Sequence, residues 1–138
     1  MNSTQNPLPR VAETEKITIN LGHVDLGHID LLVQEGFYSN RTDLIRTAIR
    51  NQLSRHGEAV DKSVARRQLD LGLRRIGRDE LEAAKRAGKV LHIQVLGLVS
   101  IGADVSAKLA RDTIGSLHVL GTLQASPEVK AALSDRIR

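Results

Sequence analysis

The sequence predicts an α+β protein in two parts: an N-terminal strand–helix–helix unit completed by a second copy of the chain, and a small C-terminal α/β domain of three strand–helix repeats. Apolar residues alternate with polar ones over residues 16–21 and then adopt helical spacing. A pattern of 24 to 25 residues recurs through the second half. We therefore expect the following parts: a flexible arm at 1–13, the strand–helix–helix unit at 14–57, a connecting segment at 58–70 and the repeat domain at 71–138.

Residues 16–21 are expected to form a strand. A period of two places three apolar side chains on its inner face, namely Ile17, Ile19 and Leu21. The polar side chains of Lys16, Thr18 and Asn20 then face outward. One strand alone leaves its backbone groups unpaired, and about forty residues bury too little apolar surface to be stable alone. We therefore expect two chains to pair these strands antiparallel in a homodimer.

Two helices follow this strand. The apolar spacing predicts the first over residues 24–35, closed by Gly36 as its C-cap and weakened by Gly27. The second is expected to begin at Ser39 as N-cap and to run to about His56. Together with the inner strand face, the expected dimer core comprises five apolar helix residues: Ile29, Leu32, Leu44, Ile45 and Ile49.

The outward strand residues suggest a binding chemistry. A two-stranded ribbon fits the major groove of double-stranded DNA, where polar side chains meet the base edges. The pattern alone fits an ordinary solvated strand face equally well. The start of the second helix offers free N–H groups and the positive end of a dipole, which suits phosphate. Arg46 and Arg50 lie four residues apart on the polar face of that helix, where solvation is the simpler role.

Three segments in succession resemble a known family. They are the run from Glu15 to Leu21, a helix ending at Gly36, and the run from Phe37 to Arg50. Together they resemble the bacterial ribbon-helix-helix family of the CopG, Arc and MetJ repressors. The resemblance implies a non-enzymatic, homodimeric transcriptional regulator, a repressor, that binds double-stranded DNA. It also implies that Lys16, Thr18 and Asn20 contact bases, and that Ser39, Asn40 and Arg41 contact phosphate.

Two other functions use the same DNA-binding chemistry. An antitoxin would bind a toxin partner through its C-terminal half while repressing their shared operon, but such tails are usually disordered until bound. An ordered repeat domain favours the regulator. A plasmid-partition or conjugation accessory protein stays open as an alternative.

The repeats predict the fold of the second half. Residues 95–105 align with 119–129, and a weaker copy lies at 71–79. Each copy has a strand followed by a short helix, expected at 78–87, 104–112 and 127–134, and this order predicts parallel strands with right-handed crossovers. We expect the partner chain or residues 58–67 to cover the sheet edges. The domain is expected to reinforce dimerisation or to join dimers, with a small-ligand sensor as the alternative.

Composition narrows the function further. The net charge of +4 favours an anionic partner, while one Phe and one Tyr argue against stacking on single-stranded nucleic acid. The chain has no cysteine, and His92 and His118 occupy different repeat positions, so neither a metal nor a cofactor is expected. We find no phosphate loop or nucleophile elbow, which argues against an enzyme. The apolar stretch at 90–103 is too short to cross a membrane, and we expect a cytoplasmic protein.

Overall fold

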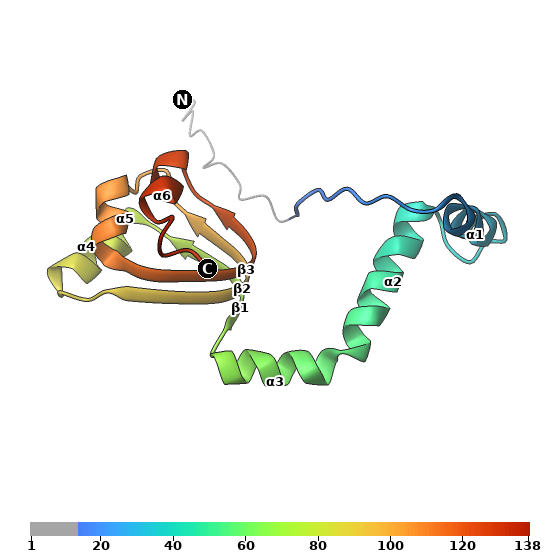
Figure 1. Ribbon diagram of the computed structural model, residues 1–138, viewed down its shortest axis with the longest axis horizontal. Coiled ribbons are helices and arrows are strands. Elements are labelled where there is room, and N and C mark those ends of the chain that lie inside the picture. Colours follow the sequence, from blue (N-terminus) through green and yellow to red (C-terminus); the bar gives the residue numbers. More distant parts are fainter. Residues whose placement is uncertain (1–13) are drawn as a thin grey trace, which may run out of the picture. The chain divides into compact units, whose positions relative to one another are not determined.

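The computed structural model describes residues 14–138, and the flexible arm expected at 1–13 lies outside them. The chain divides into two compact units. The N-terminal unit is Lys16–Arg66; the C-terminal unit is Arg67–Arg138, and Glu15 belongs with it (Figure 1). Each unit is described by itself below.

The N-terminal unit consists of helices. They are α1 (His23–Gln34), α2 (Arg41–Arg55) and α3 (Gly57–Arg67). The first two match the predicted helices to within one or two residues, whereas α3 occupies most of the segment expected to connect the two parts. Residues 14–22 form neither helix nor strand in the single chain. The pairing expected for residues 16–21 would require the second chain.

Local hydrogen bonds set the ends of α1 and α2. Gly36 adopts a φ of +84°, and the N–H of Phe37 donates to the carbonyl of Leu32 at 3.0 Å, as in a Schellman C-cap. The predicted N-cap of α2 is wrong by one residue. Asn40 is the N-cap, because its side chain accepts from the N–H of Asp43 at 2.8 Å.

The C-terminal unit is a three-stranded parallel sheet with three helices. Its strands, in spatial order, are β1 (Asp70–Ile76), β2 (Leu91–Ile101) and β3 (Ile114–Gln124). Its helices are α4 (Arg78–Arg86), α5 (Ala107–Thr113) and α6 (Pro127–Ala132) (Figure 1). The predicted strand–helix repeats with parallel strands are confirmed.

A column of glycines crosses the sheet at the repeat positions. Gly72 pairs with Gly97, and Gly97 pairs with Gly121, so the repeat found in the sequence is also the register of the sheet. Their φ angles are +108°, +140° and +127°. A Cβ on Gly97 would lie 2.2 Å from the carbonyl oxygen of Gly72, and one on Gly121 would lie 2.0 Å from that of Gly97. Only glycine fits where these backbones approach so closely.

One predicted helix start is wrong. The helix expected from Asp104 begins at Ala107 instead, and Ser106 is its N-cap, accepting from the N–H of Leu109 at 3.1 Å. Asp104 lies in the preceding turn, where Val105 donates its N–H to the carbonyl of Gly102. Val105 is buried in the core. The chain therefore places an apolar residue inward before the helix can start.

The core lies between one face of the sheet and the three helices. Its members come from every strand and helix of the unit, and the largest fully buried ones include Ile76, Leu81, Ile114, Leu117 and Leu133. The free edge of β3 is partly covered by the C-terminus, because Leu117 accepts from Arg138 and donates to Arg136 at 2.9 Å each. The chain thus covers part of this edge with its own C-terminus.

Candidate nucleic-acid interface

The segment 16–21 presents both of its faces to solvent in the single chain. Ile17 is 75% exposed, Ile19 63% and Leu21 41%. The polar residues between them, Lys16, Thr18 and Asn20, are exposed as well and make no hydrogen bond or ion pair within residues 14–138. This segment therefore carries an apolar and a polar face, neither of which is covered within its own chain.

The helices of the N-terminal unit also leave apolar side chains uncovered. Of the predicted dimer-core residues on α1 and α2, Leu32 and Ile49 are exposed, and the other three are only half-buried: Ile29, Leu44 and Ile45. No described residue of this unit is buried. The unit has apolar surface on the strand segment and on both helices, but no core of its own.

The N-terminus of α2 carries a hollow of about 300 Å³. Its lining residues are Asn40, Thr42, Asp43, Arg46 and Arg50. The two arginines are exposed and form no ion pair within the described part of the chain. Asp43, whose carboxylate accepts the N–H of Ser39 at 3.0 Å, adds one negative charge, so the two arginines leave the lining with an excess of one positive charge. A cationic hollow at the start of a 15-residue helix is suited to a phosphate group.

Arg46 and Arg50 are exposed, as the sequence predicts for solvated surface residues, and they also line the same hollow as the N-cap residue Asn40. Part of the signal was available, because positions four apart on a helix lie on one face, and Thr42, Arg46 and Arg50 follow one another at that spacing. What the sequence did not show was the hollow that brings them together.

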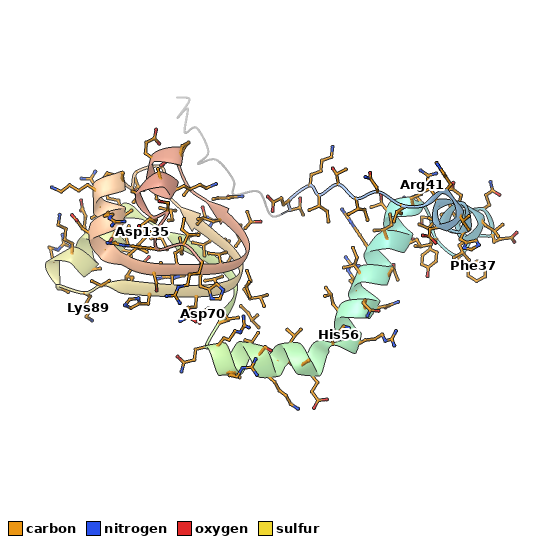
Figure 2. The ribbon with its side chains drawn as sticks, viewed as in Figure 1. Phe37, Arg41, His56, Asp70, Lys89 and Asp135 are labelled. Atoms are coloured by element: carbon orange, nitrogen blue, oxygen red, sulfur yellow. The ribbon has the colours of Figure 1, made fainter. Side chains whose placement is uncertain are left out.

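Arg41 lies at the start of α2, where the sequence predicted it, but has a partner in its own chain (Figure 2). Its Nε and Nη2 donate to the two carboxylate oxygens of Asp30 on α1, each at 2.7 Å. The hydrogen bond from Arg41 lowers the pKa of Asp30, and the same bond raises the pKa of Arg41. This two-point pair joins α1 to α2. The three predicted phosphate residues thus meet at the start of α2, each with at least one group engaged within the chain.

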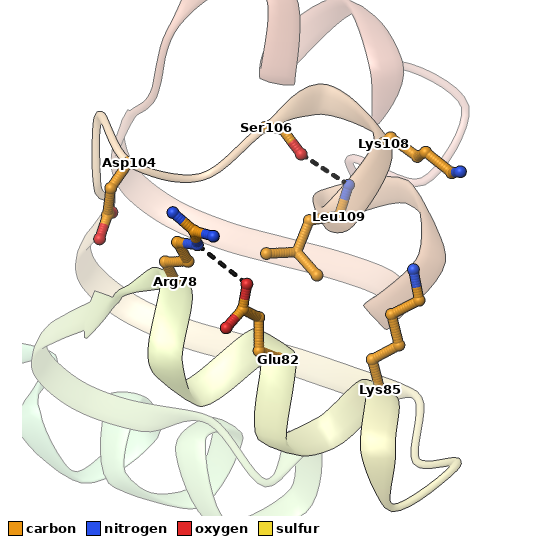
Figure 3. A pocket seen from close by; sticks show the side chains of 7 residues that line it. All are labelled: Arg78, Glu82, Lys85, Asp104, Ser106, Lys108 and Leu109. Atoms are coloured by element: carbon orange, nitrogen blue, oxygen red, sulfur yellow. Dashed lines mark hydrogen bonds and ion pairs between the residues drawn. The ribbon is translucent and has the colours of Figure 1, made fainter.

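A second hollow, of about 420 Å³, lies between α4 and α5 in the C-terminal unit (Figure 3). Cationic and anionic side chains share its lining, which comprises Arg78, Glu82, Lys85, Asp104, Ser106, Lys108 and Leu109. Arg78 donates to Glu82 at 2.9 Å, and Ser106 caps α5. The opposite charges partly neutralise each other, and we assign this hollow no role.

The histidines do not gather. His92 shares a 2.8 Å hydrogen bond with Ser116, while His118 pairs in register with Gln94. Residues 14–138 contain no group of three or more side chains of the metal-binding kinds, histidine, cysteine, aspartate and glutamate, that could hold a metal ion. Among the helices of these residues, none is both long and apolar enough to span a membrane.

An exposed alternating segment, two helices and a cationic hollow at the second helix are the parts that a DNA-binding strand–helix–helix module requires. The sequence pattern of the ribbon-helix-helix transcriptional regulator family matches residues 12–130, and the chain belongs to this family. The match continues from the N-terminal unit through the sheet, beyond the segments on which the resemblance rests. Comparison with the curated proteins and with the solved structures gave no match.

Proposed function

We propose that the protein is a sequence-specific regulator, a repressor, that binds double-stranded DNA as a homodimer. The observation that carries this proposal is the N-terminal unit, which has apolar surface on every element but no buried residue. Family membership supplies the DNA-binding class. The exposed apolar surface of this unit is the reason to propose a dimer, because a second chain would bury it.

Dimerisation would pair the free backbone groups of the 16–21 segment and cover the exposed apolar side chains at the same time. Antiparallel pairing of the two 16–21 segments gives their backbone groups partners, and the inner faces with Ile17 and Ile19 close over the helices. Burial of a side chain such as Ile19 contributes about 1.5 to 3 kcal/mol, and each such contribution occurs twice in a symmetric dimer. The outer face of this ribbon then carries Lys16, Thr18 and Asn20 from both chains.

The polar face is suited to the major groove. Asn20 can donate to and accept from an adenine edge, Lys16 can donate to guanine, and Thr18 can contact either base edge or a thymine methyl group. Since these side chains have no partner within residues 14–138, binding DNA would break no interaction inside the described chain. We assign base contact to these three residues.

Phosphate contact belongs to the start of α2. We assign it to the hydroxyl of Ser39 and the N–H groups of Asn40, together with Arg46 and Arg50, because the N–H of Ser39 already donates to Asp43. In this assignment the guanidinium of Arg41 positions α2 against α1 through Asp30, and any phosphate that it contacts must share it with that carboxylate. The ordered C-terminal unit favours a regulator over an antitoxin whose tail is disordered.

The experiment begins with the duplex selected by the protein from a random library. Lys16→Ala and Asn20→Ala are expected to reduce the preference for this duplex over random DNA by about 1 to 3 kcal/mol per lost base contact. Lys89→Ala, an exposed lysine in the C-terminal unit, is the matched control. If both variants still preferred the selected duplex as strongly as the wild type does, the assignment of base contact to Lys16 and Asn20 would be wrong.

The phosphate residues are tested in the same assay at several salt concentrations. Arg46→Ala and Arg50→Ala are expected to weaken binding to selected and random DNA alike, and to reduce the slope of log affinity against log salt by about one per lost contact. A loss confined to the selected duplex would contradict the phosphate assignment, since phosphate contacts carry no sequence information.

A further inference from the structure

The helices cover only one face of the C-terminal sheet. Along β2 the buried residues are every second one on either side of Gly97: Ile93, Val95, Val99 and Ile101. The residues between them point the other way and are not buried. Through the strand register they extend into two rows across the sheet, Leu71–Leu96–Leu120 and Leu73–Leu98–Thr122. We call this surface the outer face.

The centre of the outer face is apolar and its ends are polar. Five of the six side chains in its two rows are leucines, and Leu71, Leu73 and Leu120 are 65%, 51% and 40% exposed. Polar residues follow at both strand ends, with Gln94 and His118 at one and Arg75, Ser100 and Gln124 at the other. An apolar centre within a polar rim is the anatomy of a protein–protein interface.

We propose that the outer face packs against the outer face of a second copy of this chain. Charge supports this occupant. The only side chain of these rows and ends with a full charge is Arg75, at the corner of the edge strand β1. A face without clustered charge meets its own copy without repulsion between like charges. Its leucines would offer no attraction to the phosphates of DNA.

The small size of the outer face indicates that the second copy is one already joined to the first chain through the N-terminal units. Three strands about 4.8 Å apart, with about five residues of 3.3 Å each, span roughly 15 by 17 Å. Interfaces that are stable alone bury about 800 Å² per partner, and a face of this size buries less. Two chains joined at their N-terminal units would hold two such faces at an effective concentration in the millimolar range. The inference rests on the proposed dimer for this tether.

One contact on the edge strand β3 bears on a rival occupant of the outer face, a segment of the same chain. Thr122 donates through Oγ1 to a carboxylate oxygen of Glu15 at 2.6 Å, within the same unit. The residue that makes this contact is charged, and Leu71 and Leu73, two strands away from Thr122, keep more than half of their surface exposed. Glu15 therefore occupies one corner of the outer face and leaves its apolar centre for another partner.

The first test is an association measurement on the full chain. Leu73→Glu places a charge at the apolar centre, and Ala83→Glu places the same charge on the exposed surface of α4, in the helix layer. By sedimentation equilibrium, Leu73→Glu is expected to weaken self-association by about tenfold or more relative to Ala83→Glu. Equal association of the two variants would overturn the proposal, provided that both melt as folded proteins.

A second readout does not depend on a destabilising substitution. Because the chain has no cysteine, Ser100→Cys on the rim provides a single thiol, with Ala83→Cys as its control. A short bismaleimide is expected to link two Ser100→Cys chains and to leave Ala83→Cys chains unlinked. Failure of the Ser100→Cys link overturns the inference. The proposed function fails separately, because DNA discrimination by Lys16 and Asn20 reports only on the N-terminal unit.

Discussion

The two units of this chain differ in where their apolar side chains lie: one unit buries them and the other exposes them. In the C-terminal unit, fourteen hydrophobic residues are buried, from Leu69 to Leu133. In the N-terminal unit, no described residue is buried, and Ile17, Val24 and Phe37 are 70% exposed or more. One polypeptide thus combines a unit that buries its own core with a unit that leaves its apolar surface uncovered in the single chain.

The difference follows from topology. Three parallel strands joined by helices can cover one sheet face with their own crossovers, so the C-terminal unit builds a core from local repeats. A single strand with two helices has no such option. In the proposed dimer the missing strand comes from another chain, so we expect formation of the DNA-binding surface to be coupled to dimerisation and folding of the C-terminal core to be independent of it.

The largest expected effect comes from Ile19→Ala. Loss of this side chain from a dimer core costs about 2 to 4 kcal/mol per chain, and a symmetric dimer loses it twice. We expect the dissociation constant measured by dilution to rise by several orders of magnitude, and binding of DNA to be lost with it. Val90→Ala, which shortens a 54% exposed residue of the C-terminal unit, is the control and is expected to leave the dimer unchanged.

Leu117→Ala tests the closed unit. Leu117 is 0% exposed at the centre of the core, and its truncation is expected to cost about 3 to 5 kcal/mol. Chemical denaturation should show this loss in the C-terminal transition at every protein concentration. If the loss of unfolding free energy grew on dilution, the core of this unit would depend on a second chain. The two units would then not differ in whether they fold without a partner.

Gly97→Ala tests the glycine column. The added Cβ would meet the carbonyl oxygen of Gly72 at 2.2 Å in a backbone with a φ of +140°. Overpacking and backbone strain together are expected to destabilise the C-terminal unit by about 2 to 4 kcal/mol, measured in the same denaturation experiment.

The control for this substitution is Gly27→Ala in the N-terminal unit. Gly27 lies within α1, and a Cβ there would meet nothing within 4 Å. The change should therefore stabilise the helix by about 0.5 to 1 kcal/mol. A loss at Gly27 equal to that at Gly97 would show that the column has no special constraint.

Repetition made the C-terminal unit predictable. Gly72, Gly97 and Gly121 recur in the sequence because their backbones are neighbours in the sheet, so the period gave the register directly. The start of α5 was not predictable from the repeat. Asp104 matches Asp79 in sequence, but Val105 is buried first and Ser106 then caps the helix. The contact of the C-terminus with Leu117 lies outside the repeat and had no sequence signal.

The candidate site was predictable in its residue types and less so in their partners. Alternation over 16–21 separates a polar face from an apolar one, and both are exposed in the single chain. The pairing of Arg41 with Asp30 could not be predicted, because it depends on how α1 packs against α2. Arg46 and Arg50, the two cations of the hollow, form no ion pair with an acidic residue among residues 14–138, and this too depends on how the helices pack.

The smallest expected effect concerns the Asp30–Arg41 pair. Both side chains are about half exposed, so solvent screens their attraction. Because Arg41 lowers the pKa of Asp30, the pair stabilises the N-terminal unit above the ordinary carboxyl pKa, and this stability is lost as pH falls through the lowered value. Asp30→Asn should therefore be less stable than the wild type at neutral pH and equal to it in acid, and high salt should reduce the gap. Asp135→Asn, which removes the carboxylate paired with Arg111, is the control in the C-terminal unit and should change only that unit's transition.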